Sequence, residues 1–472
     1  MLPDNVLLEF FDLYRKDSYE SYPRLLPWEV WNWHFLVHVC QKWRQIVFAS
    51  PHRLNLRLLC TYGTPVNKNL CIWPVFPIVI QYRYSGSGVT PDDEDNVIAA
   101  LKHPDRVCDL GLDITGSQWE KMATVMQEPY LVLTRLEISA EDRNSPVLPA
   151  EFLGGSAPCL RRIYLNRVPF PALPTLLLSA SDLVDIDLRR IPPTGYISPE
   201  AMVACLATLP RLDSFYIGFL LATPRPDRIH PPPVTRTVLP ALTYFGFRGP
   251  SEYLEDLVAR IDSPQLDRIY IDYLNQLVDF QVTQLSRFIN RSFGPKLGLF
   301  RHAQVSFISG WVTFAMNLRP NRPSWDRHPA TTMISCEEFD WQVSHMAQVL
   351  SQFSATLSNV VHLKLKVEPE GRQLEGTDNV EWQPFLRPLS TVQTLHVSEE
   401  LAGHIALSLE AITGETVAEA FSSLDLIYLA GQPASSVEKF VAARRLSDRP
   451  VTIIETETEF DERVKSYVSK EE

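Results

Sequence analysis

The chain has 472 residues, a hydrophobic content of 45% and a formal net charge of −12, from 44 basic and 56 acidic residues. This composition is ordinary for a soluble globular protein, and the acidic balance argues against nucleic-acid binding, which needs a concentrated basic surface. The seven cysteines are scattered and never spaced as Cys-x-x-Cys, so we expect buried, reduced thiols. The first residues lack the charged segment and following apolar stretch of a secretory signal peptide, so we expect a cytoplasmic or nuclear protein.

The first 59 residues are predicted to form a small helical module with more apolar side chains than its own core can bury. Pro3 suits the first turn of a helix, and a second helix is expected to contain Val39 to Arg44. Two apolar stripes at helical spacing run through these helices: Leu7, Phe10, Phe11 and Tyr14, then Leu36, Val39, Cys40, Trp43, Ile46 and Val47. A module this small is marginal alone, and uncovered Leu, Phe and Trp side chains mark a docking surface.

The same segment carries four short motifs: Leu2-Pro3, Leu7-Leu8 with Phe11, Val39-Cys40 with Trp43-Arg44, and Ser50-Pro51. Together these motifs resemble those of an F-box. The resemblance implies docking onto the Skp-type adaptor of cullin-based (SCF) ubiquitin ligases. It implies adaptor contacts by Leu2, Pro3, Leu7, Leu8, Phe11, Val39, Cys40, Trp43 and Ile46. The segment from Tyr14 to Pro27 is longer than the family's usual linker, so Trp28, Trp31 and Trp33 belong only loosely to this surface and could instead pack the module onto the next segment of the chain.

Residues 60–100 are expected to be a linker with a capping strand. They resemble the junction in F-box/leucine-rich-repeat proteins of mushroom-forming fungi, through the runs Cys60 to Val66 and Trp73 to Tyr82. Pro77 followed by Ile78-Val79-Ile80 predicts a buried strand on chemistry alone. The apolar run at 70–80 is far shorter than the roughly 20 residues that a membrane span needs.

From Val107 onward one six-residue sequence pattern recurs, with apolar residues at its first, fourth and sixth positions. Its central residues are Leu110, Leu136, Ile163, Ile186, Phe215, Phe245 and Ile269, which lie 26, 27, 23, 29, 30 and 24 residues apart. The pattern is interrupted between residues 307 and 360 and recurs around Leu363, Leu395 and Leu424. Leucine-rich repeats have a period of about 20–29 residues, with one short strand and a helical return in each.

A doubly wound α/β sheet would also alternate strands and helices. Its strands should be continuous apolar runs, because helices cover both faces. Here the strands at 162–166, 185–189 and 268–272 alternate apolar and polar residues, which favours a solenoid with one open sheet face. Long loops are expected near 223–233 and 318–332, a single helix from Cys336 to Leu357, and an acidic tail at 455–472.

No motif points to catalysis. The chain lacks a glycine-rich phosphate loop and a G-x-S-x-G turn. His34 and His38 have a spacing that could hold zinc, but the Glu of H-E-x-x-H and a cysteine pair are missing. We therefore expect no catalytic residues, no metal and no cofactor.

The predicted open face offers a candidate substrate site. Tyrosine recurs at one equivalent strand position, as Tyr164, Tyr216 and Tyr270, and Tyr244 lies two residues earlier in its own repeat. Two of these tyrosines are flanked by arginines, Arg162 and Arg268. Tyr and Arg are enriched at binding hot spots, and a solenoid's sheet is a usual recognition surface. The alternative is that these tyrosines merely cover the sheet.

The sequence thus predicts an α/β protein that is not an enzyme. Its parts are an all-α F-box-like module at 1–59, the linker and capping strand at 60–100, an irregular leucine-rich-repeat solenoid (a curved parallel sheet with helical returns) at 101–454, and the tail at 455–472. By resemblance, it is the substrate-recognition subunit of an SCF ubiquitin ligase, bound to the adaptor and through it to a cullin. The alternative is an interaction scaffold that acts outside any ligase. Neither hypothesis involves nucleic acid or a membrane.

Overall fold

The computed structural model describes residues 3–19, 32–51, 53–82, 90–140, 147–221, 235–274, 282–317, 329–368, 381–411, 422–430, 437–446 and 448–456. The chain divides into two compact units, Met1–Leu220 and Leu221–Glu472, which we call the N-terminal and C-terminal units. No helix within the described ranges is long and apolar enough to cross a membrane.

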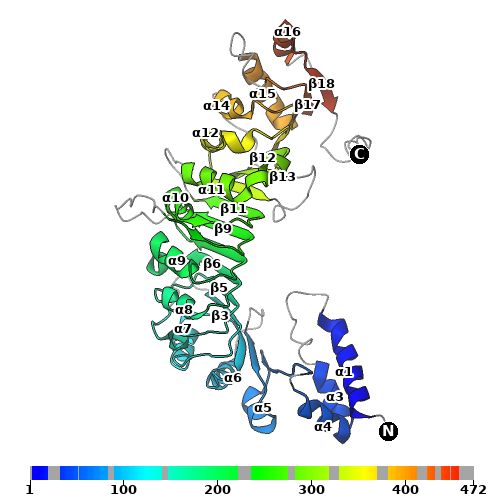
Figure 1. The fold of residues 1–472 in the computed structure, drawn as a ribbon, viewed down its shortest axis with the longest axis vertical. Helices are drawn as coiled ribbons and strands as arrows, with labels where there is room; N and C mark the ends of the chain where they lie inside the picture. The colour runs from blue at the N-terminus through cyan, green and yellow to red at the C-terminus, as the bar shows by residue number, and fades with distance from the viewer. Residues whose placement is uncertain are drawn as a thin grey trace. The chain divides into compact units, whose positions relative to one another are not determined.

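Within the described residues, the N-terminal unit begins with the helices α1 (Asp4–Tyr19), α3 (Asn32–Val39) and α4 (Gln41–Ala49), drawn in blue in Figure 1. The predicted continuous helix through Val39 to Arg44 is wrong. Cys40 has an extended backbone (φ −162°, ψ 168°), and its Sγ accepts a hydrogen bond from the Trp43 N–H at 3.5 Å. Cys40 therefore separates α3 from α4 and caps the second of them.

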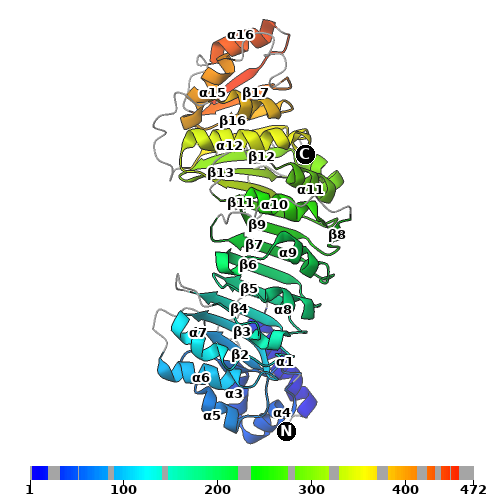
Figure 2. The same ribbon diagram turned by 90° about the vertical axis from the view of Figure 1, so that its left-hand side faces the viewer.

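In the described part of the N-terminal unit, seven parallel strands form the sheet in strict chain order. They are β1 (Leu58–Cys60), β2 (Ile78–Tyr82), β3 (Val107–Ile114), β4 (Arg135–Ala140), β5 (Arg162–Asn166), β6 (Asp185–Ile191) and β7 (Ser214–Phe219). Figure 2 shows β2 to β7 side by side. Strands that follow one another in sequence are also neighbours in space, which is the connectivity of a repeat solenoid. The strand predicted after Pro77 is β2.

The returns between these strands are short helices. They are α5 (Val66–Ile72), α6 (Pro91–Leu101), α7 (Gly116–Ala123), η1 (Phe152–Gly155), α8 (Leu173–Ser179), η2 (Pro193–Gly195) and α9 (Pro199–Leu206). Figure 1 shows α7, α8 and α9 on one side of the strands. In β5, Ile163 and Leu165 are buried while Tyr164 stays partly exposed. The predicted leucine-rich-repeat character is therefore confirmed, with one covered face and one face that we call the open face.

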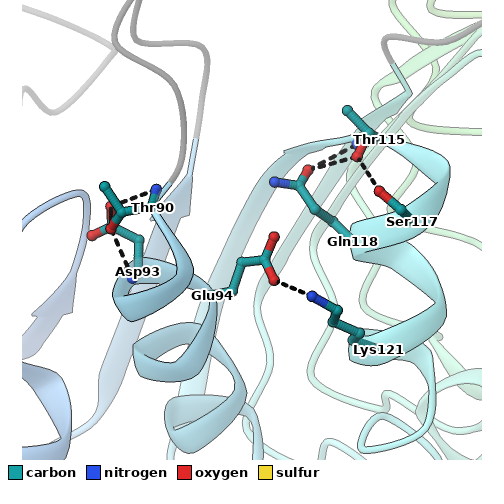
Figure 3. A network of polar contacts seen from close by, with 7 residues as sticks. All are labelled: Thr90, Asp93, Glu94, Thr115, Ser117, Gln118 and Lys121. Carbon is teal, nitrogen blue, oxygen red and sulfur yellow. Dashed lines mark hydrogen bonds and ion pairs between the residues drawn. The ribbon is translucent and has the colours of Figure 1, made fainter.

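Capping boxes fix the starts of two of these helices (Figure 3). The Thr90 side chain accepts from the Asp93 N–H, and the Asp93 carboxylate accepts in return from the Thr90 N–H. Thr115 and Gln118 form the corresponding box at α7. Such reciprocal bonds satisfy N–H groups that the first helical turn leaves without partners.

The C-terminal unit continues the repeats with mostly parallel strands. Its sheet has the order β9-β11-β14-β13-β12-β15-β16-β17-β18. These strands are β9 (Tyr244–Gly249), β11 (Arg268–Tyr273), β12 (His302–Ile308), β13 (Trp311–Asn317), β14 (Ala330–Ser335), β15 (His362–Val367), β16 (Thr394–Val397), β17 (Leu426–Ala430) and β18 (Thr452–Thr456). A separate two-stranded ladder joins β8 (Thr237–Val238) to β10 (Ile261–Asp262).

Helices alternate with these strands along the chain. They are α10 (Ser251–Ala259), α11 (Thr283–Phe293), η3 (Gly294–Leu299), α12 (Phe339–Gln352), α13 (Ser354–Leu357), α14 (Gln383–Leu386), η6 (Arg387–Leu389), α15 (Glu399–Ala411) and α16 (Glu438–Leu446). The predicted helix from Cys336 to Leu357 is thus two helices, because the backbone leaves helical geometry at Phe353 (φ −95°, ψ 12°).

An antiparallel insertion explains the interruption of the sequence pattern. β13 pairs antiparallel with both β12 and β14, while β14 runs parallel to β11 and β12 parallel to β15. Gly310 turns the β12–β13 hairpin with φ +86°, a conformation that favours glycine. The loop predicted at 318–332 gives way to β14 from Ala330 onward, and residues 318–328 lie outside the described ranges.

Other predictions fall partly or wholly outside the described residues. The loop near 223–233 does so entirely, and the acidic tail does so beyond Thr456, the last residue of β18. All seven cysteines are free. The expectation that they are buried holds for Cys60 and Cys205 but not for the exposed Cys40, Cys71 and Cys159.

Candidate interaction surfaces

Helix α1 carries two apolar stripes that are offset by one or two residues. The first closes the core of the module: Leu7 is 5% exposed and Phe11 is fully buried. The second faces outward, with Val6 at 42%, Phe10 at 54% and Leu13 at 63% exposure. These three residues are spaced i, i+4 and i+7, so they lie on one side of the helix. The module therefore presents an apolar surface beyond what its core uses.

Trp43 of α4 connects the two stripes. Its ring lies 4.8 Å from the Phe11 ring, edge-on, and 6.3 Å from the Phe10 ring, centroid to centroid. Helix α3 adds two further exposed apolar side chains, Phe35 and Val39.

Ion pairs also link α1 to the rest of the module: Lys42 pairs with Asp4 at 2.9 Å, and Arg53 pairs with Asp12 at 2.9 Å.

The structure sorts the nine predicted adaptor contacts by exposure. The expectation that Leu7, Phe11 and Ile46 are uncovered is wrong, because all three are buried in the module's own core. Leu8 and Trp43 are half-buried, whereas Pro3, Val39 and Cys40 are exposed. Leu2 lies outside the described residues. Sequence reasoning missed Val6, Leu13 and Phe35 because a helical stripe is defined only to within one residue when adjacent positions are all apolar.

Trp33 packs the module onto the first repeat. Its indole meets the Trp73 ring at 5.2 Å and the Phe76 ring at 5.6 Å, both edge-on, and Phe48 lies 5.8 Å from Phe76. Trp33 is buried. Of the two roles left open for the tryptophans, Trp33 therefore has the packing role, while Trp28 and Trp31 lie outside the described residues.

On the open face of the N-terminal unit, Tyr164 and Tyr216 belong to one row across the sheet. The register pairs Tyr164 with Asp187 and Asp187 with Tyr216, so the predicted equivalence of the two tyrosines is confirmed. Arg189 lies between their rings, with its guanidinium carbon 5.6 Å from the Tyr164 centroid and 5.3 Å from the Tyr216 centroid. These are cation–π distances.

Asp187 completes this cluster. It accepts a hydrogen bond from Arg189 Nε at 2.8 Å. Burial raises the pKa of Asp187, and the Arg189 hydrogen bond and charge oppose that rise. The same hydrogen bond raises the pKa of Arg189, against the effect of burial. We call Tyr164, Asp187, Arg189 and Tyr216 the clamp. Arg189 is half-exposed, so the clamp offers a held cation flanked by aromatic rings.

Arg162 lies in the neighbouring row, between Arg135 and Asp185. Arg135 is ion-paired with Glu137. Burial raises the pKa of Asp185, and a hydrogen bond with Ser214 and the Arg162 charge oppose the rise. Two positive side chains, Arg135 and Arg162, and one carboxylate, Asp185, thus lie in the row beside the clamp. The sequence analysis named Arg162 but missed Arg189 and Asp187. Both alternate with apolar residues in the sequence of β6, and this alternation places them on the open face.

The remaining predicted substrate residues lie in the C-terminal unit. Tyr244 and Arg268 are register partners, and the Arg268 guanidinium carbon lies 5.2 Å from the Tyr244 ring centroid. The Tyr270 hydroxyl donates to the Met333 sulfur at 3.7 Å. The six predicted residues therefore form two groups, one in each unit.

The described residues hold no group of three His, Cys, Asp or Glu side chains that could bind a metal ion. His38 is exposed. A surface hollow of about 690 Å³ in the C-terminal unit is lined by residues that include Glu381, Trp382 and Arg387.

Comparison with known proteins adds little to these observations. No family model matches the chain, and no curated protein matches it. Among solved structures, the chain is similar to the leucine-rich-repeat-containing protein LegL7 from Legionella pneumophila. That alignment covers 84% of this chain and 99% of the other, at 13% identity and a TM-score of 0.30. So low a score carries no argument, and the leucine-rich-repeat character rests on the strand order and period described above. Such a fold is that of a protein-interaction scaffold.

Proposed function

We propose that this chain is the substrate-recognition subunit of an SCF-type ubiquitin ligase. Its N-terminal helical module would dock onto a Skp-type adaptor, and the open faces of its sheets would bind a protein substrate. The observation that carries the proposal is the outward apolar stripe of α1, formed by Val6, Phe10 and Leu13. A module that has already closed its core with Leu7 and Phe11 gains nothing from these side chains in water, so they favour a partner.

The motifs that resemble an F-box support the same assignment. Pro3, Val39 and Cys40 belong to those motifs and are exposed, so they are available to an adaptor. Leu7, Phe11 and Ile46 would support docking indirectly, by fixing the helices that carry the surface. Trp43 would do both, because it packs on Phe11 and borders Phe10.

The clamp supports the substrate-binding part of the proposal. Arg and Tyr dominate protein-binding hot spots, and here their geometry is preorganised by Asp187. A receptor of this kind needs no chemistry of its own. It acts by holding a substrate near the ubiquitin-loaded enzyme, which raises the effective concentration of the acceptor lysine.

Affinity purification of the tagged full-length chain tests the proposal. The adaptor and a cullin should both copurify with the wild-type chain, and a Phe10→Ser/Leu13→Ser variant should lose both. Capture of the adaptor without a cullin would favour the rival hypothesis of a scaffold outside a ligase. Equal recovery of the adaptor by wild type and variant would contradict docking through α1.

A further inference from the structure

The backbone is left-handed at two arginines that occupy equivalent positions in consecutive repeats of the N-terminal unit. Arg167 follows β5 with φ +60°, and Arg190 lies in β6 with φ +50°. The register pairs Asn166 with Arg189, and the Arg167 N–H donates to the Arg189 carbonyl at 2.9 Å. Arg167 and Arg190 are therefore neighbours at the carboxyl ends of their strands, which lie side by side in Figure 2.

A β-bulge accounts for the direction of the Arg190 side chain. Between the register pairs Leu188–Ile217 and Ile191–Phe219, β6 has two residues and β7 has one. Bulges of this kind redirect a side chain and are common beside functional sites. Regular alternation after Leu188 would turn Arg190 toward the core, whereas the bulge leaves Arg190 exposed and returns Ile191 to the buried face.

Both arginines hold a backbone conformation that glycine adopts readily and that strains other residues. Strained positions persist where the surrounding structure imposes them, and they cluster at ligand-binding sites. Glycine at either position would satisfy the backbone equally well, so the turn itself does not call for arginine. The reason for these residues therefore lies in their side chains.

In the part of the chain that the structure describes, the guanidinium groups of Arg167 and Arg190 have no anionic partner. Arg167 is half-buried, and its Nε is enclosed without a hydrogen-bond acceptor. An unpaired donor of a charged group is unfavourable when it is buried. The Asp187 carboxylate is already paired with Arg189. An anion supplied by another molecule would compensate the charge of both unpaired groups.

Exposed apolar side chains flank the two arginines along this edge of the sheet. The Leu148 N–H donates to the Pro169 carbonyl, and the Leu220 N–H donates to the Ile191 carbonyl, both at 2.9 Å. Val147 is 50% exposed and Leu220 is 39% exposed. We call the resulting series across the repeats the cationic edge; its members are Val147, Arg167, Arg190 and Leu220.

The chemistry of the cationic edge selects its occupant. A guanidinium group forms paired hydrogen bonds with a planar carboxylate, and exposed Val and Leu side chains favour apolar partners on either side. A doubly charged anion suits this place less well, because the Asp185 and Asp187 carboxylates lie on the same strand. Three strand spacings amount to about 14 Å, which about four steps of an extended peptide can span.

We infer that Arg167 and Arg190 bind acidic side chains of an extended substrate peptide, while Val147 and Leu220 contact the apolar residues that flank those acids. The inference deepens the proposed function, on which it rests in taking the peptide to belong to the substrate. The cationic edge adjoins the clamp through Arg189, so one substrate segment can contact both.

Fluorescence anisotropy tests the inference with the full-length chain and a fluorescein-labelled peptide, Leu-Glu-Glu-Glu-Leu between Gly/Ser flanks. We expect saturable binding that becomes about tenfold weaker or more in an Arg167→Gln/Arg190→Gln variant. Arg161→Gln is the matched control, because Arg161 is an exposed arginine at the opposite end of β5. This control should bind like wild type, and a peptide with Gln in place of Glu should bind at least about tenfold more weakly.

An Arg167→Gly/Arg190→Gly variant separates binding from folding. Glycine relieves the strain of the positive φ, so this variant should have at least the Tm of wild type. It should nevertheless bind the acidic peptide as weakly as the Gln variant. A lower Tm would show that the two side chains serve the fold, and would overturn the inference.

Three other results would also overturn it. They are equal affinity of wild type and the Gln variant for the acidic peptide, tighter binding of a phosphoserine version of the peptide, and tighter binding of a single-stranded DNA oligonucleotide of equal charge. The Gln variant should still copurify with the adaptor, so failure here is distinguishable from failure of the docking proposal.

Discussion

Phe11 and Trp43 meet edge-on, with ring centroids 4.8 Å apart and ring planes at 62°. This contact joins α1 to α4 inside the core of the helical module. Phe10, one residue earlier, borders the same indole from the exposed side. Adjacent phenylalanines therefore have separable roles, one in stability and one in the outward surface.

The stability of the module should depend on Phe11 and not on Phe10. We expect Phe11→Ala to destabilise the module by about 3–5 kcal/mol, because it removes a fully buried ring and leaves a cavity. Phe10→Ala should change the stability by about 0.5 kcal/mol or less, as is usual at the surface. Hydrogen exchange of α1 amides in the full-length chain measures both. Similar exchange in the two variants would contradict the separate roles given to Phe11 and Phe10.

Substrate capture should depend on the clamp in the N-terminal unit. We expect Tyr164→Ala/Tyr216→Ala and Arg189→Gln each to reduce the recovery of substrate proteins under proteasome inhibition, because either change removes the held cation or its flanking rings. Arg211→Gln is the matched control, since Arg211 is an exposed cation of the same unit, paired with Asp182 at 3.0 Å. Adaptor recovery should stay unchanged in all three. If the clamp variants recover the same proteins as wild type, the clamp does not bind substrate.

Asp93 should stabilise the first repeats as a carboxylate. Burial raises its pKa, but hydrogen bonds from Thr90, the Gly63 N–H and Tyr82 outweigh burial and lower the pKa below the usual value. The stabilisation is therefore complete above about pH 4, the unfolded value, and is lost as the pH falls through the lower folded value. We expect Asp93→Asn to cost about 1–3 kcal/mol at pH 7, measured by urea unfolding. Wild type and variant should converge near pH 2; a constant difference would contradict this.

The stacked histidines, His302 and His396, should make the stability of the C-terminal unit sensitive to acid at a higher pH than the range in which Asp93 is protonated. His302 stacks on His362, and His396 stacks on Tyr428. Burial lowers their folded pKa values, to about 4 for His302 and about 3 for His396, below the unfolded value of 6.5. The unfolded chain therefore binds more protons, and stability should fall as the pH drops from about 6.5 toward 4. After allowance for solvent screening, the loss should be on the order of 3 kcal/mol. A His302→Gln/His396→Gln variant should show a smaller loss in thermal melts across this range. An unchanged slope would contradict the account.

Much of the solenoid could be predicted from the sequence because each strand alternates apolar and polar residues. Ile163 and Leu165 flank Tyr164 in β5, and this alternation identifies the strand, its buried face and its place in the array. The antiparallel insertion could not be predicted in the same way. Its strand β13 is almost wholly buried, so it shows no alternation, and only the position of Gly310 hints at a hairpin.

The candidate sites were only partly predictable. Tyr164 and Tyr216 were identified by their equivalent positions, but the Arg189 contact depends on the side chain reaching between two neighbouring strands. On α1, the order of apolar residues did not decide which stripe faces inward. That choice depends on Trp43, which is distant in sequence and fills the space beside Phe11.

The most direct test of the account is a calorimetric titration of the purified full-length chain with a purified Skp-type adaptor. We predict saturable one-to-one binding with a negative heat-capacity change, as expected when apolar surface is buried. A Phe10→Ser/Leu13→Ser variant, with the unfolding stability of wild type, should bind at least about tenfold more weakly. No detectable binding by the wild-type chain, or equal affinity of the variant, would contradict the claim that the outward stripe of α1 is an adaptor surface.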